Sequence, residues 1–331
     1  MILAGDIGGT KTNLGLFEVT EGALTSGNQQ SFASREHSGL ESIIDQFMTS
    51  AGTPLIAAAC FGVAGPVVEG RSVTPNLPWV VESADLAKRL NLDSIALIND
   101  VEATAYGIGE LRIGEFVSLN QGTIEPGNAA LIAAGTGLGI AGLYWDGEKH
   151  VPSASEGGHM DFAPRNQLET ELFRYLLEKT SHVSVERVLS GPGLFNIYDF
   201  LRATGYAAEL PAIAQRLKER DKSSVVANAA LAGECRLSVK ALDMFVSIYG
   251  ATAGNIALLL KATAGVYIGG GIAPKIVEKL TDGTFMKAFA EKGRLSSLLE
   301  EIPVRVILND KTALLGAARV AARRAAPPPL T

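Results

Sequence analysis

The first hundred residues alternate between apolar segments and segments with the spacing of a helix. An apolar start leads through the Gly-rich "GDIGGTKT" into "NLGLFEV", which predicts two strands joined by a tight turn. Residues 40–52, "LESIIDQFMTSAG", place apolar side chains on one helical face, with Gly52 as the stop. Residues 54–67 and 94–100 each contain an apolar run that predicts a buried strand. Strands that alternate with helices in this way indicate an α/β sheet.

A second stretch repeats the opening pattern. Residues 129–148, "AALIAAGTGLGIAGLYWDGE", resemble residues 2–22 at an offset of about 127 residues, from Gly8 to Gly135. Each copy has an apolar strand, a turn rich in Gly and Thr, and a second strand. The repeat predicts two related domains, each with a Gly-rich turn, and two hairpins that look alike by chance are the alternative. Residues 129–145 carry no charge, but four glycines interrupt them, so we predict a buried hairpin rather than a membrane helix.

The rest of the chain is mainly helical in pattern. Residues 224–260 are too long for one ordinary helix, and we expect a break near Gly233 or Gly250. Residues 265–280, "GVYIGGGIAPKIVEKL", predict a strand, a triple-glycine turn and a helix. A strand at "PVRVILND" and a final helix at "TALLGAARVAARRAA" follow.

Composition narrows the class of protein. The 331 residues suffice for two domains, and 47% apolar residues exclude global disorder. A net charge of −6 without a basic run disfavours a nucleic-acid partner. Cys60 and Cys235 are isolated, which is typical of buried small hydrophobes rather than of a disulfide or a zinc cluster. The N-terminus lacks the basic start of a signal peptide, so we expect a cytoplasmic protein with no membrane partner.

The glycine turns are candidates for phosphate binding. Gly8-Gly9-Thr10 and Gly135-Thr136-Gly137 leave backbone N–H groups uncovered, and hydroxyls in both turns and at Thr12 add donors. Neither turn matches a P-loop or a dinucleotide-binding fingerprint. One such turn alone would indicate a plain hairpin. Two in matching positions, with Gly269-Gly270-Gly271 ahead of a helix, fit a nucleotide held between two domains.

Two acids stand at the ends of predicted strands. Asp6 lies just before the first turn, where a carboxylate can hold Mg²⁺ through water or can cap the turn. Asp100 ends "SIALIND", at the sheet edge where α/β proteins bind ligands. Its carboxylate can accept a proton from a hydroxyl that attacks a phosphoryl group, and Asn99 can hydrogen-bond the same substrate. A simple turn is the alternative.

The segment "EGGHMDF" gathers three more polar side chains. Glu156, His159 and Asp161 lie within six residues, behind and beside a pair of glycines. They could hold a metal ion, grip a polyhydroxylated substrate, or be ordinary loop residues.

Several blocks of the chain resemble the bacterial glucokinase family, in the order found there. They are "DIGGTKTNLGL", "INDVEATAYG", "AAGTGLGIA", "EGGHMDFAP", "VSVERVLSGPGLFNIY", "IGGGIAP" and "LLGAA". The resemblance covers roughly residues 2–318, and "EGGHMDFAP…VERVLSGPGL" is highly specific to the family. It points to the non-ROK branch, because the stretch after His159 lacks the cysteines of the ROK zinc loop, and no structural zinc is expected there.

The resemblance implies an α/β protein with the two-domain actin-like ATPase (ribonuclease H-like) fold. Each domain would be a mixed sheet with helices, with a cleft between the domains. The smaller domain is expected at residues 1–110 plus about 302–325, since the C-terminal helix folds back in the family, and the larger at 111–301. Residues 326–331 would be a loose tail, and a homodimer is expected.

The implied activity is that of a glucokinase, which transfers the γ-phosphoryl group of ATP to the 6-hydroxyl of D-glucose. Asp100 would be the catalytic base, and Asp6 would hold Mg²⁺ through water. The residues expected to bind the sugar are Asn76, Asn99, Asp100, Glu156, His159 and Glu186. Those expected around the nucleotide are Asp6, Gly8, Gly9, Thr10, Lys11, Thr12, Gly135, Thr136, Gly137, Gly269, Gly270 and Gly271. Whether Lys11 meets a phosphate or is an exposed turn residue stays open, and Asp161 is expected to brace its loop.

Three alternatives remain. Another sugar kinase of the same fold, for mannose, fructose or an amino sugar, would share most of these residues. A sugar-binding repressor would carry a helix-turn-helix ahead of the first strand, for which we expect no room. An actin-like or chaperone-like ATPase module would lack the set Glu156, His159 and Glu186.

Overall fold

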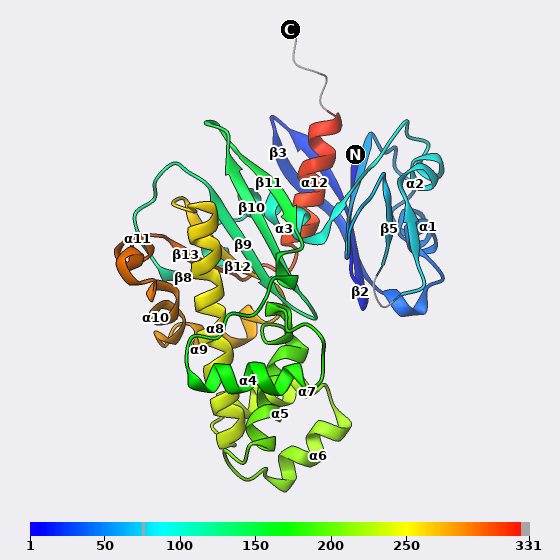
Figure 1. The fold of residues 1–331 in the computed structure, drawn as a ribbon. Helices are drawn as coiled ribbons and strands as arrows, with labels where there is room; N and C mark the ends of the chain where they lie inside the picture. The colour runs from blue at the N-terminus through cyan, green and yellow to red at the C-terminus, as the bar shows by residue number, and fades with distance from the viewer. Residues whose placement is uncertain (75–76, 326–331) are drawn as a thin grey trace. The chain divides into compact units, whose positions relative to one another are not determined.

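The structure, a computed structural model, describes residues 1–74 and 77–325 (Figure 1). They divide into two compact units, unit 1 at Met1–Ile113 with Asn309–Thr331 and unit 2 at Gly114–Leu308. The strand at Val304–Ile307 pairs with two strands of unit 2, so residues 302–308 belong to that unit and not to the smaller domain, where the sequence had placed them. Asn76 and the predicted tail at 326–331 lie outside the described residues.

Unit 1 is an α/β unit built on one mixed sheet. Its strands are β1 (Ile2–Ile7), β2 (Lys11–Thr20), β3 (Ala23–Ala33), β4 (Ala58–Val63), β5 (Arg71–Val73), β6 (Val80–Glu82) and β7 (Ala96–Asn99). Its helices are α1 (Leu40–Ser50), α2 (Ser83–Leu90), α3 (Asp100–Gly107) and α12 (Thr312–Ala325), with short 3-10 turns η1 (Ser34–Glu36) and η2 (Ile108–Glu110). The mixed sheet has the order β3-β2-β1-β4-β7, in which β1 runs antiparallel to β2 and parallel to β4, and β5 and β6 form a separate antiparallel pair.

Alternation along the central strands gives the sheet of unit 1 two buried faces. In β1, Leu3 and Ile7 join the core that contains α1 and α2, whereas Ile2 and Ala4 join the core that contains α12. Successive side chains of a strand point to opposite faces, so a strand covered on both sides is apolar throughout. The predicted strands at β1, β4 and β7 are confirmed, with β4 beginning at Ala58, later than its apolar run. β4 is buried throughout, whereas β7 is buried only at Ala96 and half-buried at its other residues.

Helix α3 is held by unusually close packing against α12. A Cβ added to Gly107 would lie 1.9 Å from the carbonyl oxygen of Thr312, and one added to Gly316 would lie 1.7 Å from that of Ala103. The two backbones therefore touch directly. Arg319 of α12 adds a bidentate ion pair with Glu110, at 2.6 and 2.7 Å. Since α3 begins at Asp100, this packing fixes the helix that carries the predicted base.

Unit 2 combines a second mixed sheet with a group of helices. Its strands are β8 (Phe116–Asn120), β9 (Ala129–Ala134), β10 (Leu138–Trp145), β11 (His150–Ser155), β12 (Gly265–Gly269) and β13 (Val304–Ile307). Its helices are α4 (Gln167–Leu177), α5 (Gly191–Ala203), α6 (Pro211–Glu219), α7 (Lys222–Leu231), α8 (Arg236–Leu260), α9 (Val277–Leu280), α10 (Thr284–Ala290) and α11 (Ser296–Glu300). Short 3-10 turns include η3 (Ile113–Glu115), which spans the boundary between the units, η4 (Gly157–His159), η5 (Val185–Arg187), η6 (Ala273–Ile276) and η7 (Gly293–Leu295).

The sheet of unit 2 repeats the plan of the first. Its order is β11-β10-β9-β12-β13-β8, and β9 runs antiparallel to β10 and parallel to β12, as β1 does to β2 and β4. The internal repeat predicted from the two glycine-rich stretches is thus present in the topology. Residues 129–145 form the predicted hairpin. Every residue of β9 except Ala133 is completely buried.

Helix α8 is the centre of the apolar core of unit 2 and packs against α5, α7 and α10 (Figure 1). The long helical stretch breaks at residues 232–235, so the expected break near Gly233 is confirmed and Gly250 lies inside α8. Among the described residues α8 is long and apolar enough to cross a membrane, but 72% of its apolar window is buried by its own unit, as is typical of a core helix. Cys60 and Cys235 are free and buried, as expected.

Replacing Gly107 with Ala should destabilise unit 1 by about 1–3 kcal/mol, because the new methyl group overlaps the Thr312 carbonyl of α12. Gly109→Ala is the matched control, since a Cβ there meets nothing within 4 Å. Urea unfolding followed by circular dichroism measures both. Equal stability of the two variants would contradict the close packing of α3 on α12.

Candidate active site

The first glycine turn closes the β1–β2 hairpin of unit 1. The amide of Gly8 donates to the carbonyl of Lys11 at 3.0 Å, and the Ser34 hydroxyl donates to the carbonyl of Gly8 at 2.8 Å. The amide of Ser34 also donates to the carbonyl of Thr10. Ser34, which the sequence analysis did not single out, therefore supports the turn from η1. Gly9 and Thr10 complete the turn, and Lys11 is exposed at the start of β2.

Thr12 differs from its predicted role. Its side chain is completely buried, and its hydroxyl lies 3.0 Å from that of Ser34. A hydroxyl enclosed in this way faces the interior and not a phosphate, so Thr12 braces the turn instead of supplying a donor. The sequence placed Thr12 correctly on β2. Because side chains alternate along a strand, exposed Lys11 is followed by Thr12 with its side chain buried.

Asp6 lies in β1 directly across from Asn13 of β2. Its Oδ2 accepts a hydrogen bond from the Asn13 amide at 3.0 Å. Burial raises the pKa of the Asp6 carboxyl, and the bond from Asn13 and the charge of Lys11 oppose that rise. The carboxylate is thus held at the hairpin end by a neutral partner, without an ion pair.

Asn99 and Asp100 mark the point where β7 ends and α3 begins. Asn99 is the N-cap, and its Oδ1 accepts the amide of Val101 at 2.9 Å. Its Nδ2 donates to the carbonyl of Gly65 at 3.0 Å. The Asn99 amide, predicted to bind sugar, is therefore fixed in orientation by the fold. Its side chain also hydrogen-bonds the Asp100 carboxylate, which opposes the rise in the pKa of Asp100, and Oδ1 keeps one lone pair for a ligand.

The carboxyl group of Asp100 has a strongly raised pKa. Burial raises its pKa to about 6, the negative charge of Asp6 adds to the rise, and a hydrogen bond from the amide of Val101 opposes it. Asp6 acts on Asp100 because Asp6 lies near the carboxyl end of β1 and Asp100 follows the carboxyl end of β7, with β4 parallel to both strands. A carboxyl with a pKa near 6 is a stronger base than an ordinary aspartate and is still ionised at neutral pH.

The second glycine turn closes the β9–β10 hairpin of unit 2. The amide of Gly135 donates to the carbonyl of Gly137, and the amide of Gly191, the first residue of α5, donates to the carbonyl of Gly135, both at 2.8 Å. Thr136 occupies the tip. A Cβ added to Gly137 would lie 2.7 Å from Oε2 of Glu186. This turn is therefore built against the segment that carries Glu186.

Glu186 does more than the sequence predicted. Its Oε2 accepts the amide of Leu138, the residue after the turn, at 2.9 Å. One carboxylate oxygen of the expected sugar ligand thus holds the expected phosphate turn. No sequence signal marks such a contact, because it joins residues 48 positions apart.

The "EGGH" segment forms η4, packed directly on the start of β10. A Cβ added to Gly158 would lie 2.1 Å from the carbonyl oxygen of Leu138, so no other residue fits there without displacement. The side chains of Glu156 and His159 on either side are exposed. Backbone bonds between residues 160–162 and 183–185 then bring η4 beside η5, which carries Glu186. Unit 2 therefore gathers Glu156, His159 and Glu186 around one turn.

Asp161 takes the bracing position that was expected for it. Its Oδ1 lies 2.8 Å from Nε2 of His182. The contact ties the loop after η4 to the loop before η5, next to the bridge between Asp161 and Ser184.

The triple glycine joins β12 to η6 beside the second turn. Gly270 has φ +83°, and a Cβ there would lie 2.3 Å from the carbonyl oxygen of Ala134. The amide of Ile272 donates to that same carbonyl at 3.2 Å. A Cβ on Gly271 would meet nothing within 4 Å, so this backbone is open on one side. Gly270 thus lies against Ala134, the residue that precedes Gly135, and a Cβ on the preceding Gly269 would lie 3.6 Å from that of Ala133.

Within the described residues, no group of three or more His, Cys, Asp or Glu side chains could hold a metal ion alone. Mg²⁺ needs no such cage, because it commonly binds one or two carboxylates, water and substrate phosphates. Asp6 and Asp100 supply two carboxylates, and neither forms an ion pair with a cationic side chain of residues 1–74 or 77–325. This donor set fits Mg²⁺ and does not fit zinc.

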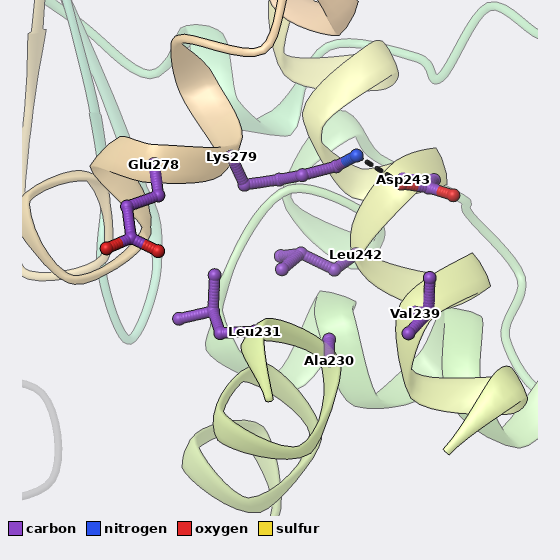
Figure 2. Close-up of a pocket in the computed structure, with 7 residues that line it drawn as sticks. All are labelled: Ala230, Leu231, Val239, Leu242, Asp243, Glu278 and Lys279. Carbon is purple, nitrogen blue, oxygen red and sulfur yellow. Dashed lines mark ion pairs between the residues drawn. The ribbon is translucent and has the colours of Figure 1, made fainter. Parts of the chain in front are cut away.

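A separate hollow of about 180 Å³ lies between α7, α8 and α9 (Figure 2). Lys279 extends across it to an ion pair with Asp243 and also pairs with Asp282. Because its cation is already neutralised by two carboxylates, we assign this hollow no role. None of the predicted site residues within the described ranges lines it.

The chain is similar to known glucokinases over nearly its full length. A family model described as Glucokinase matches residues 3–324. The chain is 43% identical to a glucokinase of Nostoc punctiforme, across 98% of this chain and 99% of that protein. It is 40% identical to a glucokinase of Synechocystis sp., across 97% and 98%. The crystal structure of a glucokinase from an Antarctic psychrotroph matches with a TM-score of 0.84 at 29% identity, over 97% and 98% of the two chains, which confirms the predicted fold class.

The electrostatic coupling within unit 1 can be measured directly. We expect the Asp100 carboxyl to titrate at about 6 and its pKa to fall in Asp6→Asn, because one neighbouring negative charge is removed. Carboxyl chemical shifts followed by NMR against pH give both values, with exposed Asp93→Asn as the control that should leave Asp100 unchanged. An unshifted pKa in Asp6→Asn would contradict the coupling.

Proposed function

This chain belongs to the glucokinase family, and from that membership we propose how its residues divide the work of the reaction. The enzyme transfers the γ-phosphoryl group of ATP to the 6-hydroxyl of D-glucose, giving ADP and glucose 6-phosphate. The observation that carries the proposal is the position of Asp100, a carboxylate of raised pKa at the end of β7.

The backbone amides of the two glycine turns bind the phosphates of ATP. Glycines leave the backbone of both turns without side chains, and a Cβ on Gly135 would meet nothing within 4 Å, so amide groups there stay open to an anion. The triple-glycine turn lies against the adenosine, where the open side of Gly271 leaves space. Lys11, exposed beside the first turn, adds a positive charge for a phosphate.

Glu156, His159 and Glu186 bind the hydroxyls of glucose, together with Asn99 and Asn76. Each sugar hydroxyl is both donor and acceptor, and carboxylates, amides and imidazole provide both functions. This proposal is supported by the packing of η4 beside η5, which brings Glu156, His159 and Glu186 together in unit 2. The fixed amide of Asn99 keeps free hydrogen-bonding capacity in unit 1.

Asp100 is the general base. It accepts the proton of the 6-hydroxyl as the oxygen attacks the γ-phosphorus, and ADP leaves with the electrons of the broken P–O bond. The raised pKa helps, because a base is most effective when its pKa lies near the working pH. Most of the rate is expected from positioning and from the turn amides that stabilise charge on the transferred group.

Mg²⁺ fits the remaining carboxylate. When bound, it neutralises charge on the terminal phosphates of ATP. Asp6 would hold it through water, since its side chain is fixed by Asn13 at the edge of the first turn. Two further expectations, a homodimer and a cytoplasmic location, stay predictions.

Asp100→Asn should abolish turnover while glucose binding largely survives, because the amide keeps the shape but cannot take the proton. In the wild type, kcat/KM should fall about tenfold per pH unit below about 6, as the base becomes protonated. Coupled ADP release and calorimetric glucose binding measure the two effects.

Stability separates loss of the base from loss of the fold. Since the folded pKa of Asp100 is raised, its contribution to stability is present below about 3.8 and is lost as pH rises through about 6. Asp100→Asn should therefore melt no lower than the wild type at neutral pH. Retention of a tenth of the activity would remove Asp100 as the base.

The two glutamates should behave differently. Glu156→Gln should raise KM for glucose about tenfold and leave KM for ATP unchanged, because Glu156 is exposed and holds no part of the phosphate turn. Glu186→Ala should raise both, because it also frees the amide of Leu138. Exposed Glu178→Gln is the control. Steady-state kinetics on both substrates decide, and equal rises for Glu156→Gln would contradict a sugar-specific role.

A further inference from the structure

A buried tyrosine of α8 reaches the point where the two nucleotide turns of unit 2 begin. Tyr249 is completely buried, and its hydroxyl lies 3.4 Å from the amide nitrogen of Ala134, the last residue of β9. The same hydroxyl lies 3.2 Å from the carbonyl of Ile132 and 3.4 Å from that of Gly269, the last residue of β12. Gly135 and Gly270, the first residues after these strands, open the two turns.

These backbone groups need a partner because the two strands separate here. The parallel ladder of β9 and β12 ends at the pair Gly269 and Ala133. Beyond it, β9 turns back into β10, while β12 enters the triple-glycine turn. A buried amide at such a fork is costly if it is left unpaired. A phenol has one hydrogen to donate and lone pairs to accept with, so one hydroxyl can serve both strands.

The ring of Tyr249 is fixed from the sides. Phe245 lies edge-on at a centroid distance of 6.0 Å, and Phe285 at 5.6 Å. The neighbouring Gly250 allows α10 to come close, since a Cβ there would lie 2.1 Å from the carbonyl oxygen of Phe285. The hydroxyl is therefore held in place by the packing of α8 and α10 and has little freedom to leave the fork.

We propose that Tyr249 is a positioning residue for the nucleotide, which holds the phosphate turn and the triple-glycine turn at a fixed separation. This inference rests on the proposed function for the nature of the ligand. Loss of the hydroxyl frees the fork, so both turns spend less time in the arrangement that binds ADP or ATP. The sugar residues on η4 and η5 meet this turn at Leu138, on the far side of Gly135 from Tyr249, so they depend on this contact less than the two turns do.

The test is Tyr249→Phe, with Tyr198→Phe as the matched control. Tyr198 is also completely buried in unit 2 and also hydrogen-bonded, but its hydroxyl donates to Glu209 at 3.0 Å and not to either turn. Calorimetry should show ADP binding weakened about tenfold in Tyr249→Phe, with glucose binding changed less than twofold. Tyr198→Phe should leave both unchanged, whatever its effect on the melting temperature.

Hydrogen exchange of the free protein gives a readout that needs no nucleotide. The amides of Ala134 and Ile272 should exchange about tenfold faster in Tyr249→Phe and at the wild-type rate in Tyr198→Phe. The role of Tyr249 would be overturned if amide exchange or ADP affinity in Tyr249→Phe equalled that of the wild type. It would also be overturned if the affinities for ADP and glucose fell by the same factor. A wild-type protein that binds no ADP would instead overturn the proposed function, so the two failures are distinguishable.

Discussion

Direct contact between backbones, with no side chain between them, is the constraint on which the candidate site residues of each unit depend. In unit 2, Gly158 lies against the carbonyl of Leu138, and Gly270 lies against that of Ala134. A methyl group at either position would overlap an oxygen atom that has no room to move. The glycines are therefore needed for packing as well as for turn geometry. Beside Gly270, a Cβ on Gly271 would meet nothing within 4 Å, so the missing side chain there leaves the backbone open to a ligand.

The same constraint operates in unit 1 at a distance from the chemistry. Helix α3 carries Asp100 at its first residue, and its other end is pressed against α12 at Gly107 and Gly316. A C-terminal helix, remote in sequence, thus fixes the direction of the helix that presents the base. The bidentate pair of Arg319 and Glu110 secures the same contact in a half-exposed position, where its energy is modest and its geometric effect is the greater.

The burial of two carboxyl groups, Asp6 and Asp100, is electrostatically unfavourable, and both lie among the proposed site residues. Asp6 and Asp100 are two carboxylates whose pKa values are both raised by burial, and the charge of the first raises the pKa of the second. An arrangement selected for stability alone would replace one of them. A pair of carboxylates that favours protonation is suited to a base and to a divalent cation, so the fold carries a local cost that the reaction explains.

Local patterns along the chain were enough to predict the main elements, the repeat and the candidate residues. Periodicity and glycine position are local properties, so the two hairpins, the strand that ends at Asn99 and the break near Gly233 could be predicted from them. The family blocks supplied roles for residues such as Glu156 that spacing alone left open.

The contacts that those residues make follow from the way in which whole elements pack together. It enclosed Thr12 against Ser34, set Glu186 on the phosphate turn and joined residues 302–308 to unit 2 through pairing of β13. It also brought Tyr249 to the fork of β9 and β12. Each of these contacts joins segments far apart in the chain. They depend on how complete elements pack, and the local pattern that specifies an element carries no information about its distant neighbour.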